Sequence, residues 1–351
     1  MNKAIESAKE ITIVIITHNR YNFLNRLLKF YDEYSEKFNF LILDSSSQIP
    51  EKSILKYFKR DNVEYHKFDS NIFYATKIAE GSIHIKTKYA VCCADDDFLI
   101  PSGIINSKEY LEKNPNYASA HGLYFNHTSP NDISIFRRFN FTALFQEGKS
   151  SEEESGLKRI TSYFGGITKS YPMYAVHRTE LFKKVWLETS EYAPDWGLSE
   201  YFLNAISLAY GKMKVLPIFY SSREPNTYVW MNEDKHSKIY TSSKVNKTIE
   251  GLSKSIQSID KISSSNARKI IKDAIQKRLD GYWFLPTKKR KKSLLSFFKS
   301  KLALQNRFKN LLGLNALDKK FYKDYILVKK AVIDAGDLRE ELNKIRKEYA
   351  N

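Results

Sequence analysis

Three consecutive aspartates, Asp95, Asp96 and Asp97, form the acidic cluster whose spacing most directly suggests chemistry in this sequence. They follow residues 89–94, an apolar run short enough to be a buried strand rather than a helix. Like charges at the end of a strand repel one another, and a hard divalent cation bound by oxygen ligands is a usual means of compensating them. The sequence therefore predicts a cation site, with a solvated acidic turn before a helix beginning at Pro101 as the alternative.

Two other predicted strands also end in polar residues. The β-branched run 11–16 is typical of a central parallel strand, and the polar residues 17–21 follow it. A second apolar strand, residues 40–43, is followed by an aspartate and three serines at 44–47. Because the carboxyl ends of parallel strands meet at one edge of a sheet, these residues and the acidic cluster at 95–97 should lie together. The arrangement predicts a binding site for a nucleotide and its metal-bound diphosphate.

Helical patterns alternate with these strands. The spacing of apolar residues predicts helices over 23–31, 50–60 and 74–81, and a short strand over 63–66. Such alternation is typical of an α/β fold with a mostly parallel sheet and helices on both faces. Further along, the pattern predicts strands over 117–125, 172–177 and 212–220, and a helix after residue 150 with Ser151 and Glu154 in capping-box spacing.

The composition is that of a folded protein in a reducing compartment. Of 351 residues, 42% are hydrophobic, and no apolar run reaches the roughly 18 residues of a membrane span. Residues 1–10 lack the apolar core of a signal peptide. Cys92 and Cys93 are neighbours on a predicted strand, so their side chains should face opposite ways and not form a mutual disulfide. These features predict a cytoplasmic protein.

Basic residues concentrate in the last third of the chain. Residues 241–351 hold 27 of the 57 Lys and Arg residues but 11 of the 40 Asp and Glu residues, and so +16 of the net charge of +17. We therefore predict two parts: a near-neutral catalytic domain over 1–240 and a basic helical region over 241–351. This region includes the cationic run 286–292. Nucleic-acid binding is not expected, because no recognised nucleic-acid motif accompanies the charge.

Two helical patterns follow in the basic region. Between 294 and 312, Leu and Phe interleave with Lys and Arg, which suits either an interfacial helix on an anionic membrane or a helix packed on the catalytic body. Between 328 and 349, apolar residues recur every three or four positions. This short heptad seam suits either a homodimer or docking on the protein's own helices.

The motifs resemble those of family 2 glycosyltransferases with the Rossmann-like GT-A fold, over about residues 10–220, and in particular bacterial members that work on surface polysaccharides. The resemblance rests on the run 17–20, on the Asp-Ser-Ser-Ser run 44–47, and on the acidic cluster with the residues up to Pro101. It implies that Asp44 contacts the base, that Asp95 lies near the ribose, and that Asp97 holds the metal with Asp95. Family members commonly have Asp-Gly-Ser at 44–46, so the resemblance leaves the donor nucleotide open. The implied donor-nucleotide site consists of Thr17, His18, Asn19, Arg20, Asp44, Ser45, Asp95 and Asp96.

Three more residues are candidates for the donor site. Lys77, on the predicted helix before the acidic strand, could contact a diphosphate oxygen as a point charge, or could simply be solvated. His236 or Arg223 could reach the metal or the diphosphate from a loop over 223–240, as C-terminal loops do in the GT-A fold. Such a loop would exclude water from the reaction.

A glycine-containing loop leads from Asp195 to Glu200 at the start of a predicted helix. In inverting GT-A enzymes a carboxylate at the corresponding junction deprotonates the acceptor hydroxyl, often within Trp-Gly-x-Glu-Asp. This chain has Tyr201 in place of the last acid, so the resemblance makes Glu200 the first candidate for the base and Asp195 the second. The alternative is that Glu200 is an acid favoured only by the helix dipole.

Together these features predict an inverting glycosyltransferase that uses Mg²⁺ or Mn²⁺. It would move a sugar from a nucleotide-sugar donor to a bacterial surface-polysaccharide or lipid-linked oligosaccharide acceptor, in the cytoplasm or on the inner face of the membrane. One alternative is a sugar-phosphate nucleotidyltransferase, although residues 17–21 lack the glycine-rich loop that such enzymes usually carry. The other is a non-catalytic adaptor that binds a membrane or nucleic acid through the basic region.

Overall fold

The computed structural model describes residues 9–34, 36–128, 140–146, 148–166, 171–224, 242–283 and 319–335. In this part of the chain a nine-stranded sheet has the order β3-β2-β1-β4-β8-β6-β9-β5, with β7 paired to β6. The strands are β1 (Ile11–Thr17), β2 (Asn39–Asp44), β3 (Val63–Lys67), β4 (Tyr89–Ala94), β5 (Phe98–Leu99), β6 (Tyr117–Thr128), β7 (Asn140–Gln146), β8 (Val176–Arg178) and β9 (Lys212–Arg223).

The sheet is mixed, with a parallel half that carries the predicted site. Strands β3, β2, β1 and β4 are parallel neighbours, and the alternation of strands and helices predicts parallel pairing of this kind. β8 is antiparallel to both β4 and β6, whereas β6 and β9 are parallel to each other. The carboxyl ends of β1, β2 and β4 therefore lie at one edge, where ligands bind in open α/β sheets.

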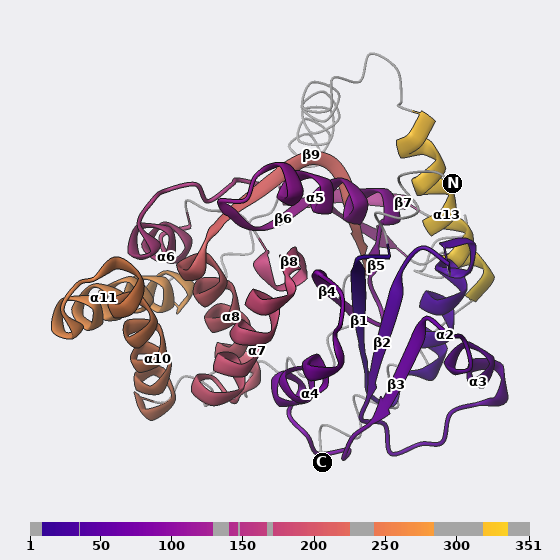
Figure 1. Cartoon of the computed structure of the whole chain (residues 1–351), viewed down its shortest axis with the longest axis horizontal. Coiled ribbons are helices and arrows are strands. Elements are labelled where there is room, and N and C mark those ends of the chain that lie inside the picture. The colour runs from indigo at the N-terminus through magenta and orange to yellow at the C-terminus, as the bar shows by residue number, and fades with distance from the viewer. Residues whose placement is uncertain are drawn as a thin grey trace.

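Helices cover both faces of this sheet (Figure 1). On one face α4 packs against α7, which also contacts β4 and β8, while on the other α2 packs beside α3. The helices are α2 (Tyr21–Phe30), α3 (Lys52–Phe58), α4 (Tyr74–Gly81), α5 (Pro101–Lys113), α6 (Gly156–Phe164), α7 (Thr179–Tyr192), α8 (Trp196–Tyr210), α10 (Ser242–Asp260), α11 (Ser264–Trp283) and α13 (Lys319–Ala335), with short 3₁₀ turns η1 (Asp32–Tyr34), η2 (Ser82–His84) and η3 (Pro172–Tyr174).

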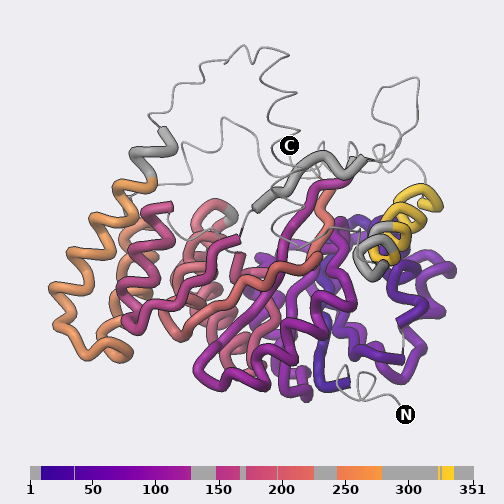
Figure 2. Tube along the Cα trace, turned by 90° about the horizontal axis from the view of Figure 1, so that it is seen from above, coloured from indigo at the N-terminus to yellow at the C-terminus, as the bar shows by residue number. Residues whose placement is uncertain are grey.

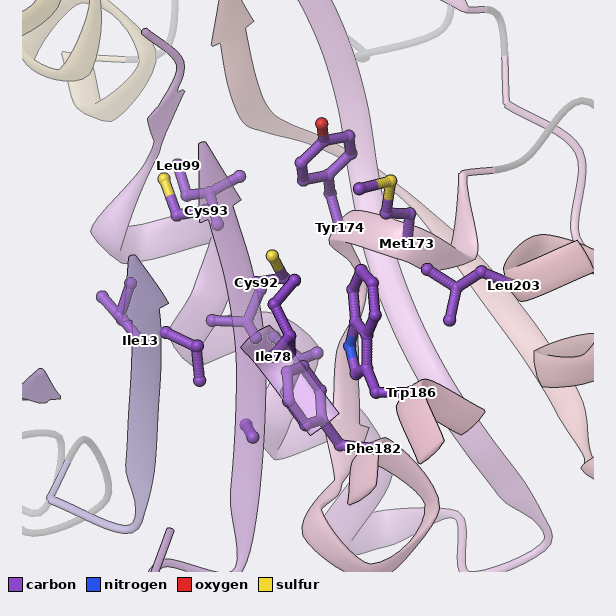
Figure 3. Packing of buried hydrophobic residues seen from close by; sticks show 14 of the residues in the cluster. Ile13, Ile78, Cys92, Cys93, Leu99, Met173, Tyr174, Phe182, Trp186 and Leu203 are labelled. Atoms are coloured by element: carbon purple, nitrogen blue, oxygen red, sulfur yellow. The ribbon is translucent and has the colours of Figure 1, made fainter. Parts of the chain in front are cut away.

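The core explains why β1 and β4 read as continuous apolar runs. Ile11 to Ile15 are all buried, as expected for a central strand covered on both faces. Cys92 and Cys93 are buried free thiols that point to opposite sides of β4. Cys92 lies on the side of Ile78, and Cys93 lies beside Leu99 (Figure 3). The predicted alternation of the two cysteines is confirmed.

Two local predictions differ from the structure. The helix after residue 150 begins at Gly156, with Ser155 rather than Ser151 as its N-cap, so the capping-box prediction was wrong. The carboxylate of Asp260 in α10 accepts hydrogen bonds from the Ser155 hydroxyl and from the Gly156 and Leu157 amides, which fixes the later start. The predicted strand over 172–177 is instead the 3₁₀ turn η3 followed by the short strand β8.

The described helices of the basic region lie at opposite ends of the molecule (Figure 2). α10 and α11 pack on α6, and α10 also packs on α8, whereas α13 packs on α2. Val328 and Val332 of α13 are buried, and Asp324 accepts a hydrogen bond from Ser102 in α5 at 2.7 Å. This part of the heptad seam therefore docks on the protein's own helices. Residues 286–312 lie outside the described ranges.

Within the described residues, none of the helices combines the length and the apolar composition that crossing a bilayer requires. The described helices of the basic region instead contribute buried side chains to the protein's own core, among them Leu252 and Ile271. The division of the chain at residue 240 remains a prediction.

Candidate active site

The three polar strand ends predicted to meet do lie at one edge of the sheet. Thr17, at the end of β1, donates a 2.7 Å hydrogen bond to Asp95, at the end of β4. The Lys77 ammonium in α4 donates to the Thr17 carbonyl at 2.9 Å and to the Ser45 hydroxyl at 2.8 Å, and so joins β1 to the end of β2. His18 Nδ1 lies 2.8 Å from the Ser45 carbonyl oxygen. The predicted convergence is confirmed, although the roles of these residues remain predictions.

Lys77 is buried, so it is not the solvated lysine considered as the alternative. It is almost fully buried, and burial lowers its pKa to about 8 despite the nearby charges of Asp44 and Asp95. Its two hydrogen bonds hold the ammonium between the ends of β1 and β2. Lys77 therefore stabilises the junction of the strand ends and adds positive charge to it.

Arginines accompany each aspartate of the acidic cluster. Arg20 Nη2 lies 3.3 Å from Asp95 and 2.8 Å from Asp96, and Arg223 Nε lies 2.9 Å from Asp97. Burial nevertheless raises the pKa of Asp95 to about 6 and that of Asp97 to about 7, although the arginines oppose this shift. The ionised carboxylates are thus incompletely compensated, and their oxygens suit a hard divalent cation, which would favour the ionised form.

The turn after β1 is shaped to meet the turn after β2. Asn19 has a positive φ of 52°, a conformation that asparagine tolerates better than most residues. Its amide donates to the Ser46 hydroxyl at 2.7 Å, and its side-chain oxygen accepts from the Ser47 amide at 2.8 Å. These bonds fix Asn19 against the serine turn, so the two predicted nucleotide-binding segments form one unit.

The carboxylate of Asp44 is fully buried and bound by four protein groups. The hydroxyls of Tyr21 and Tyr65 donate to its Oδ2 at 2.7 and 2.8 Å, and Lys67 Nζ lies 3.0 Å from the same oxygen. The Ser46 amide donates to Oδ1 at 2.7 Å. Burial opposes ionisation, but the hydrogen bonds from Ser46 and Tyr21 outweigh it and lower the pKa of Asp44. Asp44 therefore stays ionised and ties three segments together at the predicted base site.

Glu200 and Asp97 both interact electrostatically with Arg223 and Tyr174. Burial raises the pKa of Glu200, while the charge of Arg223, which also pairs with Asp97, lowers it. The Arg223 guanidinium lies 5.0 Å from the ring centroid of Tyr174. Burial raises the pKa of Tyr174 well above its usual value, and the charges of Asp97 and Glu200 raise it further. Arg223 and Tyr174 thus lie where the fields of both carboxylate groups overlap.

Asp195 has a structural task that sequence reasoning did not assign to it. It is the N-cap of α8, and its Oδ1 accepts from the amides of Gly197 and Leu198 at 3.1 and 3.0 Å. Lys244 Nζ lies 4.0 Å from the other carboxylate oxygen. Because an N-cap orients the first turn of its helix, these contacts favour Glu200 over Asp195 as the candidate base.

Residues 12–178 match the sequence model of glycosyl transferase family 2. The matched range contains β1, β2 and β4 together with the three polar strand ends. This chain carries a glycosyl transferase family 2 domain. The family 2 match confirms the family resemblance and the enzyme class, a glycosyltransferase.

Solved structures show the same fold. The structure of S. aureus TarS 1-349 in complex with UDP-GlcNAc gives a TM-score of 0.51 at 12% identity, and that in complex with UDP gives 0.50 at 12%. Each comparison covers 97% of this chain and 91% of the TarS chain. With the sheet order, this likeness confirms the predicted GT-A fold for the family 2 domain. Among curated protein sequences, none matches significantly.

His177 has a structural role in the folded chain. His177 is buried, and its Nε2 lies 2.6 Å from the Pro172 carbonyl oxygen. Burial lowers the pKa of His177 to about 4, so it is a neutral structural histidine. His236, the candidate late metal ligand, lies outside the described residues, as does most of the loop predicted to cover the family 2 site.

The sequence did not predict the contact that joins α8, which carries Glu200, to α4, which carries Lys77. The hydroxyl of Tyr74, the first residue of α4, lies 2.7 Å from the hydroxyl of Ser199 in α8, and both groups are buried. Ser199 immediately precedes Glu200, so this bond connects the base candidate to the helix that carries Lys77. Both residues are ordinary in sequence, and 125 positions separate them, so no local signal could have found the pair.

A further buried ion pair lies next to the acidic cluster. Arg26 Nη1 lies 2.6 Å from Glu224, and Arg26 Nη2 donates to the Asp96 carbonyl at 2.9 Å. Burial alone would raise the pKa of Glu224, but Arg26 and His127 lower it to about 2. The pair therefore connects α2, the acidic cluster and the end of β9.

We expect Glu224→Gln to lower the free energy of unfolding by about 3 kcal/mol at pH 7, because it leaves the buried Arg26 cation without an ionised partner. The depressed pKa stabilises the fold above the ordinary value of 4.5, and this contribution is lost as the pH falls from there towards 2. Urea unfolding at several pH values measures the effect. A difference between the two proteins that does not shrink below pH 4.5 would contradict this account.

Proposed function

We propose that the chain transfers a sugar from a nucleotide-sugar donor to an acceptor hydroxyl, with inversion at the anomeric carbon. The supporting observation is that Arg223 pairs with Asp97 of the acidic cluster at 2.9 Å and is also near enough to Glu200 for its charge to lower the pKa of that carboxyl. Inverting transfer needs one centre to hold the donor diphosphate and another to activate the acceptor from the opposite side. The acidic cluster would be the first centre, and Glu200 in α8 would be the second.

The donor nucleotide would lie across the joined turns after β1 and β2. Thr17, His18 and Asn19 would face it from one turn and Ser45 from the other, with Asp44 beside the base and Arg20 near the diphosphate. Support comes from the hydrogen bonds that make the two turns one unit. The TarS complexes contain UDP and UDP-GlcNAc, so uridine is the first base to test.

We propose that the acidic cluster holds a divalent cation, Mg²⁺ or Mn²⁺. Asp97 and Asp95 would hold it, with His236 as a further candidate ligand, and Asp96 would face the donor nucleotide. When bound, the cation would stabilise the charge of the departing diphosphate as a Lewis acid. Arg223 lies beside Asp97 and would contribute a further positive charge for the phosphates.

Glu200 would act as the general base. Its carboxylate removes the proton of the acceptor hydroxyl as that oxygen bonds to the anomeric carbon, and the bond from this carbon to the diphosphate oxygen breaks. The electron pair leaves with the nucleoside diphosphate, and the sugar inverts. The raised pKa of Glu200 makes it a stronger base than an exposed glutamate.

Two further proposals concern the acceptor and the cellular location of the protein. We propose a lipid-linked or surface-polysaccharide oligosaccharide as the acceptor, on the cytoplasmic side of an anionic membrane that the charge of residues 241–351 would favour. We also propose a homodimer through the end of the heptad seam, which light scattering would detect. The family match argues against the two alternatives, a nucleotidyltransferase and a non-catalytic adaptor.

The direct test of this proposal is a thermal-shift screen against UDP, GDP, CMP and dTDP, each with and without Mn²⁺. A ligand that binds only the folded state raises the melting temperature by mass action, by an amount that corresponds to about 2.7 kcal/mol at one hundred times Kd. We expect one nucleotide to stabilise the protein in a metal-dependent way. If no nucleotide stabilises it, the proposed donor site is wrong.

The pH dependence of sugar transfer should report the protonation of Glu200. Because burial raises its pKa above the ordinary 4.5, we expect kcat at saturating donor and Mn²⁺ to fall as the pH drops through that raised value. The base must be deprotonated to act, so the loss lies on the acid side. Measurement of kcat between pH 4.5 and 8 checks this. A rate that stays constant down to pH 4.5 would exclude a buried carboxylate as the base.

A further inference from the structure

A cluster of two histidines and a glutamate lies on the edge strand β3, away from the contacts of the acidic cluster. Glu64 and His66 are alternate residues of β3 and share one face of the strand, and His84 comes from η2. Glu64 Oε1 lies 2.8 Å from His66 Nε2 and 3.0 Å from His84 Nδ1. One carboxylate oxygen therefore meets two imidazole nitrogens that come from separate elements.

The geometry of this cluster suits a transition-metal ion. The three ligand atoms all lie within 4.8 Å of one another. Zinc binds histidine nitrogen and carboxylate oxygen at about 2.0–2.2 Å, so ligands of a tetrahedral ion lie roughly 3.3 Å apart. The contacts of 2.8 and 3.0 Å from Glu64 to the two imidazole nitrogens would need to lengthen only slightly to admit an ion. The two imidazole rings stack with centroids 3.8 Å apart and planes inclined by 28°, so the two rings lie side by side next to the same carboxylate.

We propose that Glu64, His66 and His84 form a second metal site, specific for zinc-class ions rather than for Mg²⁺ or Mn²⁺. Imidazole nitrogen favours Zn²⁺, Co²⁺, Ni²⁺ and Cu²⁺, whereas Mg²⁺ prefers oxygen ligands throughout. Three protein ligands leave the fourth tetrahedral position to water. The exposure of all three side chains, from 27% to 44%, lets an ion enter without unfolding the strand.

A metal ion at this second site would stabilise the edge of the sheet at β3. In the pairing of β2 with β3, His66 lies opposite Leu43, and Lys67 lies opposite Asp44. An ion that joins β3 to η2 would fix the strand that carries Tyr65 and Lys67, two of the groups that hold the Asp44 carboxylate. The bound ion would thus stabilise the edge of the sheet beside the donor site without touching the donor.

The test is titration of the untagged, full-length protein with Co²⁺, followed by the visible absorption of tetrahedral cobalt, and with Zn²⁺ by calorimetry. We expect one equivalent of tight binding. His84→Ala and His66→Ala should each weaken it at least tenfold, and Glu64→Gln should weaken it as well. Glu80→Gln replaces another exposed glutamate nearby and serves as the matched control, which should bind as the parent protein does.

Two results would overturn the proposal. One is that the parent protein binds no more Zn²⁺ than a His66→Ala/His84→Ala double variant whose circular dichroism shows an intact fold, which would make the cluster a hydrogen-bonded group only. The other is that Asp97→Ala abolishes the Co²⁺ spectrum, which would assign the ion to the acidic cluster. Binding that survives Asp97→Ala and is lost in the double variant establishes the second metal site.

Discussion

Replacing Glu200 with glutamine should lower kcat by about 10²–10⁴-fold, the range that a general base contributes, while donor binding stays unchanged. Glutamine keeps the size of the side chain and cannot accept a proton at neutral pH. The side chain is largely buried, and burial together with Arg223 sets its pKa, so the substitution removes chemistry rather than shape. The release of nucleoside diphosphate under saturating donor and acceptor measures the change.

The control for this substitution is Glu191→Gln, which removes an exposed carboxylate near the end of α7. It should leave kcat within about twofold, because exposed single-charge changes rarely alter a distant site. If Glu200→Gln retained more than a tenth of the parent activity, Glu200 would be only a helix-terminal acid, and Asp195→Asn would be the next variant to assay.

Replacing Asp97 with asparagine should abolish metal-dependent donor binding and lower transfer by about 10³-fold, since electrostatic stabilisation of a leaving group is a large catalytic contribution. The fold should survive. Burial already raises the pKa of Asp97 to about 7, so its ionised form is costly, and asparagine removes that charge while keeping the shape. Calorimetric titration of nucleotide with and without Mn²⁺ measures the loss.

Asp61→Asn is the matched control for Asp97→Asn, because Asp61 is an exposed aspartate before β3. It should bind nucleotide and metal as the parent protein does. Should Asp97→Asn instead unfold the protein, the ion pair with Arg223 would be structural, and the double substitution Asp97→Asn/Arg223→Gln would separate the two roles. Unchanged metal-dependent binding in a folded Asp97→Asn variant would show that the cation lies elsewhere.

The sequence predicted the framework of the site because that framework is local. The buried runs of β1 and β4 and the helix α4 match the predicted ranges closely, since continuous apolar residues and helical spacing are strong signals. The convergence of the three strand ends followed from the parallel topology alone. Two hydrogen bonds show this convergence in the structure: one from Thr17 to Asp95 and one from Lys77 to Ser45.

The partners of the charged groups could not be predicted because they are distant in sequence. Arg223 reaches Asp97 across 126 positions, and Arg26 reaches Glu224 across 198. The partners of Asp44 could not be predicted either, because its carboxylate accepts hydrogen bonds from groups in α2 and β3 that belong to no recognisable motif. Local patterns place a residue at a strand end, but only the folded chain shows which charges compensate it.

The central claim is that a nucleotide and a divalent cation bind at the joined ends of β1, β2 and β4. The most direct measurement is a crystal structure with Mn²⁺ and the nucleotide chosen by the thermal-shift screen, with the metal located by its anomalous scattering. The account predicts an anomalous peak in direct contact with Asp97, with the nucleotide against Thr17 and Ser45. A nucleotide bound elsewhere, or manganese that touches none of Asp95, Asp96 and Asp97, would contradict it.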